Sequence, residues 1–388
     1  MQLDFHYYAT ICAAYLAGYS FPDSVSIGYN AQLVDCCSKT FLARIKGPRA
    51  AATTQSQLEL ADISTDLLGL QDITRIWASF HFIPGNLYSA LDKGSRRYRQ
   101  KFHLICDVNG TLLAETVNLA KDRGIEAAGL AMHVLADTWA HRFFAGTPSF
   151  VINNTGAPFT ELIETEGGWR ERPVHFRHNP TQPDDLEQGY YTNTMFSTSE
   201  NGIMNLGHGR AGHLPDLSFM RYRYMPAWGG YALVTKDNPS DYMHAFRQMV
   251  YALRFLRGEY PAFETCRYDR ERVAPYLEDI RKILTKRQTD SSEDWKMLMY
   301  RLSGEEPEKF DIAKYEEEYI RSSAENKNNT VLGRFILAAL RQKSMVTKHI
   351  FASGNFLAGL SADFEKGGFR GIRDFRMLLE AARTEGKQ

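Results

Sequence analysis

Three ionisable residues, His133, Asp137 and His141, recur every four positions in the segment AMHVLADTWAHRFFAG. At about 100° per residue, this spacing puts their side chains on one stripe that spans about 80° of a helix surface. The neighbours Leu130 and Trp139 are apolar, so we expect the helix to be buried on more than one side. Buried ionisable groups are costly unless they are paired or bind a metal. Because imidazole and carboxylate suit zinc and related ions, we interpret the stripe as half of a metal site. A hydrogen-bonded His-Asp-His ladder without metal is the alternative.

A single helix supplies only part of a coordination sphere, so other ligands are expected elsewhere in the chain. Three polar residues stand in apolar or aromatic surroundings: His6 in DFHYYAT, Asp35 in NAQLVDCC and His81 in WASFHFIPGN. Each one alone is more typical of a satisfied core residue than of a ligand. Together with the stripe, they form an ordered set of His and Asp side chains that favours a metal centre.

A glycine-rich segment, GHGRAGHLPD, contributes His208, His213 and Asp216. Glycine lets the backbone turn sharply and approach other groups closely, so this segment could close the site or hold a substrate. Arg210 and His213 are candidates to contact substrate anions. The alternative is a surface loop with solvated histidines.

Helices must position these residues, because apolar residues recur at helical spacing through most of the chain and alternation with period two is rare. The pattern predicts an all-α protein. Its expected helices include residues 4–16, 24–37, 111–123, 240–256 and 273–287, and the stripe helix is expected from Leu130 to Gly146.

The helical period is lost between residues 147 and 230, where Gly, Pro, Asn and aromatic residues dominate. Long loops in compact domains are usually functional, so we expect an irregular, loop-rich segment that covers the site. A polar stretch after residue 287 reads as a linker. The sequence thus predicts a helical metal-binding domain over 1–287 and a small helical C-terminal region over 288–388.

The composition excludes several classes of protein. The 388 residues include 46 basic and 46 acidic side chains, and this balance argues against binding of duplex nucleic acid. The five cysteines lack CxxC spacing, which argues against a disulfide framework or a thiolate zinc site. No basic start precedes the first apolar stretch, and no run of about 18 apolar residues occurs. We therefore expect no signal peptide, no transmembrane helix and a cytoplasmic location.

The motifs resemble those of known proteins. An early His, a following Asp, a later His and a helix reading H-x-x-x-D with a further His are similar to the zinc-dependent phospholipase C and P1 nuclease superfamily. The runs DFHYYAT, FHFIPGN, AMHVLADTWAHRFFAG and GHGRAGHLPD resemble more closely an uncharacterised bacterial family, DUF6765. The resemblance covers about residues 1–256.

The resemblance implies a multi-helix fold of the phospholipase C and P1 nuclease type with clustered zinc ligands. Carried over position by position, the ligands would be His6, Asp35, His81, His133, Asp137, His141, His208 and Asp216. The secreted superfamily members begin with a Trp whose amine binds zinc, whereas this sequence begins with Met1. One or two zinc ions are therefore expected rather than three.

The function that this set favours is hydrolysis of a phosphoester, such as a phospholipid or a nucleotide, by metal-activated water. Asp35 and Asp137 would be central and either could bridge two ions, with Arg210 and His213 near the substrate. One alternative is a closed structural metal site in a helical binding module, with a protein partner on the C-terminal region. More candidate ligands occur than the four that a closed site needs, which favours catalysis. An HD-type phosphohydrolase is disfavoured because no His-Asp dipeptide occurs.

Overall fold

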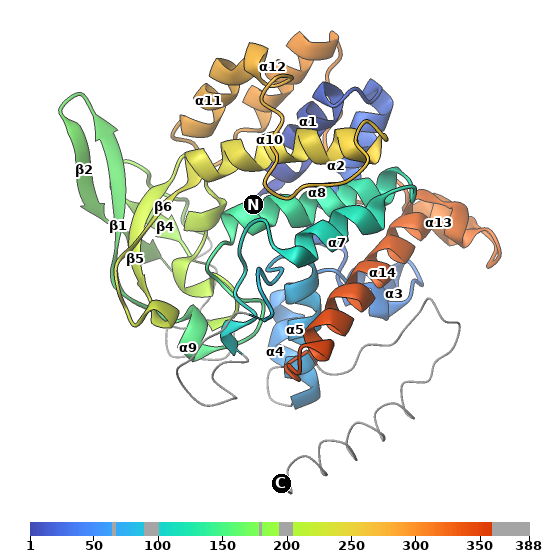
Figure 1. Cartoon of the computed structure of the whole chain (residues 1–388), viewed down its shortest axis with the longest axis horizontal. Helices are drawn as coiled ribbons and strands as arrows, with labels where there is room; N and C mark the ends of the chain where they lie inside the picture. The colour runs from blue at the N-terminus through green and yellow to red at the C-terminus, as the bar shows by residue number, and fades with distance from the viewer. Residues whose placement is uncertain (64–66, 89–100, 178–180, 194–204, 359–388) are drawn as a thin grey trace, which may run out of the picture.

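The computed structural model of the chain shows a helical body with a β-sheet on one side (Figure 1). The structure describes residues 1–63, 67–88, 101–177, 181–193 and 205–358. The central helix is α8 (Ile125–Ala140), in which every residue from Glu126 onward is buried. A helix that is apolar on all sides is stable only inside a core, so the polar residues of α8 are held away from bulk water.

Four helices pack closely around α8. They are α2 (Phe21–Cys36), α7 (Thr111–Ala120), α10 (Asn238–Leu256) and α14 (Val331–Ala352). The approach of α2 depends on Gly129, because a Cβ atom there would lie 2.4 Å from the carbonyl oxygen of Ile27. This close packing brings the C-terminal end of α2 beside the polar face of α8.

Other helical segments complete the body. They are η1 (Asp4–Ala9), α1 (Thr10–Leu16), α3 (Lys39–Arg44), η2 (Arg49–Ala51), α4 (Gln57–Ile63), α5 (Leu67–Phe80), α9 (Phe150–Asn153), η4 (Gly209–Ala211), η5 (Leu214–Asp216), η6 (Ala227–Gly229), η7 (Ala274–Tyr276), α11 (Leu277–Thr285), α12 (Ser292–Ser303), α13 (Glu316–Arg321) and η8 (Lys327–Asn329). Trp295 of α12 is fully buried and packs against Phe5 and Phe246, with ring centroids 6.0 and 5.5 Å away. Residues beyond 287 therefore share the core of the preceding helices.

The segment expected to be irregular contains two β-sheets, so the all-α prediction is wrong. An antiparallel sheet has the strand order β2-β1-β5-β6, and a parallel pair joins β3 to β4. The strands are β1 (Thr155–Thr165), β2 (Gly168–Pro173), β3 (His175–Arg177), β4 (Tyr190–Thr192), β5 (Arg221–Pro226) and β6 (Val234–Asp237). Within the expected loop-rich segment, residues 178–180 and 194–204 lie outside the described residues.

Buried charged residues hide the period of these strands. Glu161 of β1 and Lys236 of β6 point inward and are 1% and 2% exposed, so apolar residues do not alternate cleanly with polar ones. Glu161 is neutralised by Arg172 and Arg287, and Lys236 donates to the carbonyl of Trp139. A hydrophobicity pattern counts such positions as outward-facing, although their partners make them part of the core.

The helix expected from Leu130 to Gly146 ends earlier, at Ala140, with His141 as its C-cap. The chain then turns through Phe143, which has a φ of 81°. Backbone hydrogen bonds pair this turn with Cys106, from Phe143 N to Cys106 O and from Cys106 N to Phe144 O. Among the helices described, none has both the length and the apolar character of a membrane span, in agreement with the sequence analysis.

Candidate metal centre

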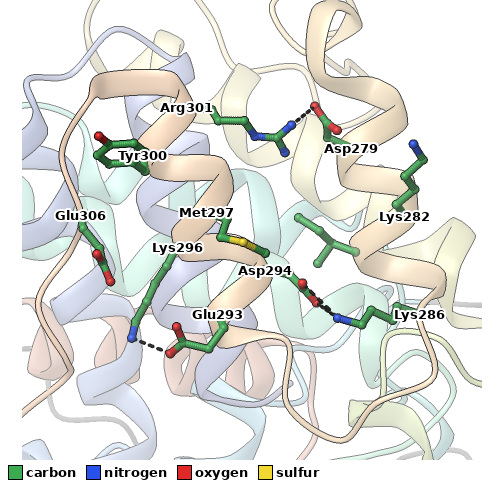
Figure 2. Close-up of a pocket in the computed structure, with 11 residues that line it drawn as sticks. Asp279, Lys282, Lys286, Glu293, Asp294, Lys296, Met297, Tyr300, Arg301 and Glu306 are labelled. Carbon is green, nitrogen blue, oxygen red and sulfur yellow. Dashed lines mark hydrogen bonds and ion pairs between the residues drawn. The ribbon is translucent and has the colours of Figure 1, made fainter.

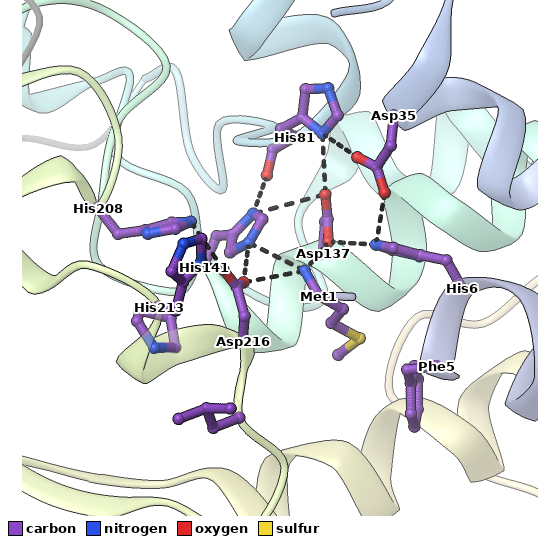
Figure 3. A network of polar contacts seen from close by, with 12 residues as sticks. Met1, Phe5, His6, Asp35, His81, Asp137, His141, His208, His213 and Asp216 are labelled. Atoms are coloured by element: carbon purple, nitrogen blue, oxygen red, sulfur yellow. Dashed lines mark hydrogen bonds and ion pairs between the residues drawn. The ribbon is translucent and has the colours of Figure 1, made fainter. Parts of the chain in front are cut away.

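Histidine and aspartate side chains from distant parts of the chain meet beside α8 (Figure 3). They form two neighbouring sets that we name by one member each. The His133 group consists of His6, Asp35, His81, His133 and Asp137. The Asp216 group consists of His141, His208 and Asp216. The structure thus brings together all eight residues that the sequence analysis selected as ligands.

The residues of the His133 group come from four helical segments. His6 lies in η1, a π-helical turn, and such turns occur frequently at functional sites. Asp35 lies in the last turn of α2, and His81 directly follows α5. His133 and Asp137 are one turn apart on α8 and face the same way. All except Asp35 are at most 5% exposed, so the group is buried.

The ligand atoms of the His133 group form two overlapping sets that share His133, one with His6 and Asp137 and the other with Asp35 and His81. Nδ1 of His81 and Nε2 of His133 lie 3.1 and 3.2 Å from Oδ2 of Asp137, and 3.2 Å from each other. Both nitrogens lie 3.8 Å from Oδ1 of Asp35. Four ligands at zinc bond lengths of about 2.0–2.1 Å in a tetrahedron are about 3.3 Å apart. The observed spacing therefore fits a metal ion without large rearrangement.

The tautomer of His81 is determined by its backbone partner. Its Nε2 lies 3.0 Å from the carbonyl oxygen of Thr53, which can only accept, so Nε2 carries a hydrogen. The other nitrogen, Nδ1, then faces the carboxylates of Asp137 and Asp35. Either a proton or a metal ion must therefore lie between Nδ1 and these carboxylate oxygens. The two negative charges favour a divalent ion in that position.

The histidines of the Asp216 group are oriented in the same way. Nδ1 of His141 donates to the carbonyl of His81 at 2.8 Å, and Nδ1 of His208 donates to that of Gly212 at 2.7 Å. Their Nε2 atoms turn toward Asp216, at 3.1 Å from Oδ1 and 3.7 Å from Oδ2 respectively. Both rings therefore direct their second nitrogen at a carboxylate.

Two histidines have buried ring nitrogens without hydrogen bonds. Neither nitrogen of His6 forms one with a described residue, although its Nε2 lies 3.1 Å from Oδ1 of Asp137. Nδ1 of His133 is also unsatisfied among the described residues, and the two rings stack with centroids 3.8 Å apart. An unpaired buried polar atom is costly, and coordination of an ion by Nε2 of His6 would remove one such cost.

The protonation states of four groups suit metal binding, whereas at His81 burial is outweighed by the hydrogen bond and charge of Asp137, which raise the pKa. Burial and the neighbouring His133 lower the pKa of His6 to about 4, and burial lowers the pKa of His208 to about 4. Burial alone would raise the pKa values of Asp137 and Asp216, but the surrounding basic groups hold both well below their usual range. At neutral pH these histidines are therefore neutral and these carboxylates ionised, which is the form that binds metals.

The amino nitrogen of Met1 lies between the two groups, a position that the sequence analysis did not identify. It is 3.0 Å from Oδ1 of Asp137, 3.1 Å from Oδ1 of Asp216 and 3.2 Å from Nε2 of His141. Burial acts to lower the pKa of this amine, but the carboxylates of Asp137 and Asp216 raise it to about 11. The nitrogen therefore sits where a cation is needed, and only the folded structure reveals this.

The loop that carries Asp216 is held by the first turns of α10. Nδ2 of Asn238 lies 2.8 Å from the carbonyl oxygens of both Leu214 and Leu217, and the hydroxyl of Tyr242 donates to that of Pro215. Both side chains are buried. A polar clamp of this kind positions the short helical turn η5, on which Asp216 lies.

Of the two residues predicted to contact substrate, His213 contacts a ligand residue of the centre, whereas Arg210 contacts Asn205, which is not one. Nδ1 of His213 is 3.4 Å from Oδ2 of Asp216, and its side chain is 39% exposed. The hydrogen bond with Asp216 raises the pKa of His213. Arg210 places its Nε 3.4 Å from Oδ1 of Asn205. Asp35, at 31% exposure, is the most accessible residue of the His133 group, and His213 is an accessible neighbour of the Asp216 group.

The fold and the site together define a mainly helical protein with a small sheet and a buried histidine–aspartate centre. The model of DUF6765, a family of unknown function, matches residues 1–350, and the chain belongs to that family. The match confirms the closer of the two resemblances and extends it beyond residue 256. No curated protein and no solved structure matches the chain significantly. The comparisons thus give no support to the distant relation with the phospholipase C and P1 nuclease superfamily.

Proposed function

We propose that this protein is a metal-dependent hydrolase of phosphoesters that holds two divalent ions of the zinc class. The observation that carries the proposal is the orientation of His81, His141 and His208. Each donates one ring N–H to a main-chain carbonyl and directs its other nitrogen at carboxylates. Metal-binding histidines are almost always oriented in this way, because the donated hydrogen bond fixes the tautomer and makes the ligand more basic.

The position of Asp137 supports two ions rather than one. Its Oδ2 faces His81 and His133, while its Oδ1 lies 3.0 Å from the Met1 nitrogen, which also contacts Asp216. A carboxylate that faces two ligand sets can bridge two ions, and ions in such pairs lie about 3.5–4 Å apart. Asp137 would therefore serve both groups, each of which would hold one ion.

The chemistry follows from this assignment. Bound ions would lower the pKa of a water molecule and neutralise charge on phosphoryl oxygens. His213 is placed to exchange a proton with the substrate, because Asp216 orients one of its nitrogens while the ring remains partly exposed. The accessible edge at Asp35 offers a second approach to the centre. The alternative, a structural metal site in a binding module, is favoured by the burial of most ligands.

An activity assay with matched variants distinguishes catalysis from structure. We would follow hydrolysis of bis(p-nitrophenyl) phosphate and of phosphatidylcholine vesicles by zinc-loaded protein. Asp35→Asn is compared with Asp279→Asn, because the two carboxylates are 31% and 33% exposed and only the first lies in the centre. The proposal predicts loss of turnover in Asp35→Asn alone, with both variants folded. No turnover of either substrate by the wild type, with zinc bound, would instead support the structural alternative.

A further inference from the structure

A pocket lined by arginines lies where α10, α11 and β5 meet, apart from the ligand residues of the metal centre. Its volume is about 260 Å³, and its polar lining consists of Arg221, Ser240, His244, Arg247, Arg281 and Thr285. Among its described lining residues there is no carboxylate. Three permanent cations therefore face one small space.

Among the three arginines, the charge of Arg247 is the least neutralised by other side chains. Its Nε is buried without a hydrogen bond to any described residue, and the charges that act on its guanidinium include no described carboxylate. Arg270 and Arg281 are the charges that act on it, and both repel it. By contrast, Arg221 pairs with Asp237 at 2.9 Å and Arg281 with Glu278 at 3.4 Å. The pocket thus holds positive charge that the protein itself does not neutralise.

A second groove shows what a balanced site looks like in the same protein. The groove between α11 and α12, of about 750 Å³, is larger and is lined by charged side chains of both signs (Figure 2). Three of its cations pair with its own acids: Lys286 with Asp294, Lys296 with Glu293 and Arg301 with Asp279. These three cations are paired within the lining of that groove, whereas the lining of the arginine-lined pocket includes no described carboxylate to pair with its arginines.

We propose that the arginine-lined pocket binds the phosphoryl group of a small phosphorylated ligand. The planar guanidinium matches two oxygens of a phosphate, and the hydroxyls of Ser240 and Thr285 can donate to the others. The first turn of α10 also borders the pocket, and its dipole favours an anion. The volume is below the range of about 300–1,000 Å³ typical of drug-sized ligands, which suits a small anion.

The arginines of the pocket differ in their exposure to solvent. Arg247 is partly buried, so its bond to an anion is protected from water, while Arg281 is 60% exposed and stands at the entrance. The ring of His244 stacks on Trp139, with centroids 5.2 Å apart and planes 12° apart, which fixes one wall. The pocket is therefore built from side chains that are already in place before a ligand arrives.

Calorimetric titration with pyrophosphate tests the proposal. The full chain is first freed of metal with a chelator that is then removed by dialysis, so that the metal centre contributes no binding. We expect one pyrophosphate per chain at low ionic strength and weaker binding as salt is added. Arg247→Gln and Arg281→Gln should each weaken binding about tenfold or more, because a charge-assisted hydrogen bond is lost. Arg301→Gln, in the balanced groove, should leave the affinity unchanged.

Three outcomes would overturn the proposal. They are the absence of binding to the wild type, equal affinity of the wild type and both pocket variants, and binding of citrate as tight as that of pyrophosphate. The last result would assign the pocket to carboxylates instead. Because Arg281 is largely exposed, Arg281→Gln is expected to fold normally, which thermal unfolding of the variant would verify.

Discussion

The main-chain carbonyl of His81 accepts a 2.8 Å hydrogen bond from Nδ1 of His141. One candidate ligand is thus oriented by the backbone of another, and the two belong to different ligand groups. Replacement of the His81 side chain removes a ligand from the His133 group but leaves the carbonyl that orients His141.

His81→Ala should therefore affect the two groups unequally. We expect the variant to lose about one of two bound ions and to keep the ion of the Asp216 group, because His141 remains oriented. Zinc per chain, measured by mass spectrometry of the dialysed protein, checks this. Loss of both ions from a folded variant would show that the groups are not separable in this way.

Asp137→Asn should have a larger effect, since Asp137 faces both groups. We expect loss of at least one ion and a fall in phosphodiesterase turnover of at least about 100-fold, because even groups that only orient metal ligands are worth about 10–100-fold. The matched control is Asp269→Asn, another buried carboxylate, which pairs with Arg254. The control should lower the melting temperature but retain metal, and equal metal loss in both variants would argue against a role of Asp137 as a ligand.

Asn238→Ala tests the clamp on the loop of Asp216. The substitution leaves buried carbonyls of Leu214 and Leu217 without their side-chain donor, so the free energy of unfolding should fall by about 1–3 kcal/mol. Zinc affinity of the Asp216 group should fall as well, because the loop is less well positioned. Tyr242→Phe removes a single hydrogen bond to Pro215 and should cost about 1 kcal/mol. Urea unfolding and zinc titration check both variants, and unchanged zinc affinity in Asn238→Ala would contradict the clamp.

Lys343 provides a test by pH that is independent of the metal centre. Its Nζ donates to the carbonyl of Ala50 at 2.7 Å, and burial lowers its pKa from 10.5 to about 8. The unfolded chain holds this proton up to about pH 10.5 but the folded chain only to about pH 8. The contribution of Lys343 to stability is therefore most unfavourable below pH 8 and improves as the pH rises to 10.5.

Lys343→Met should remove this penalty. At pH 7 the variant should be more stable than the wild type by about 1–2 kcal/mol, after allowance for the lost hydrogen bond. Urea unfolding at pH 7 and pH 10 measures the difference, which should shrink at the higher pH. A difference that does not change with pH would show that the lysine is not buried as described.

The helices could be predicted because their apolar residues follow the helical period. The stripe of His133 and Asp137 was readable for the same reason, since spacing on one helix is a local property. The end of α8 at Ala140 was not readable, because it depends on backbone hydrogen bonds to Cys106, which is distant in sequence. The face of the helix on which these residues lie could be predicted, but tertiary contacts determine the residue at which the helix ends.

The sheet and the finer details of the centre depend on contacts that a linear pattern does not contain. Tyr222 and Tyr224 of β5 do alternate with arginines, but Glu161 and Lys236 break the alternation in the neighbouring strands. Likewise, the residue types predicted which histidines are candidate ligands, but not which ring nitrogen faces the centre. That choice depends on carbonyl groups such as that of Thr53, which the sequence does not distinguish from any others.

The metal content of the purified wild-type protein tests the central claim most directly. Elemental mass spectrometry after dialysis, and again after titration with zinc, gives the number of ions per chain. We predict about two divalent ions per chain, and fewer in Asp137→Asn, as expected for a two-ion centre. A folded protein that carries no metal and takes up none on titration would contradict the assignment of the His133 and Asp216 groups as a metal centre.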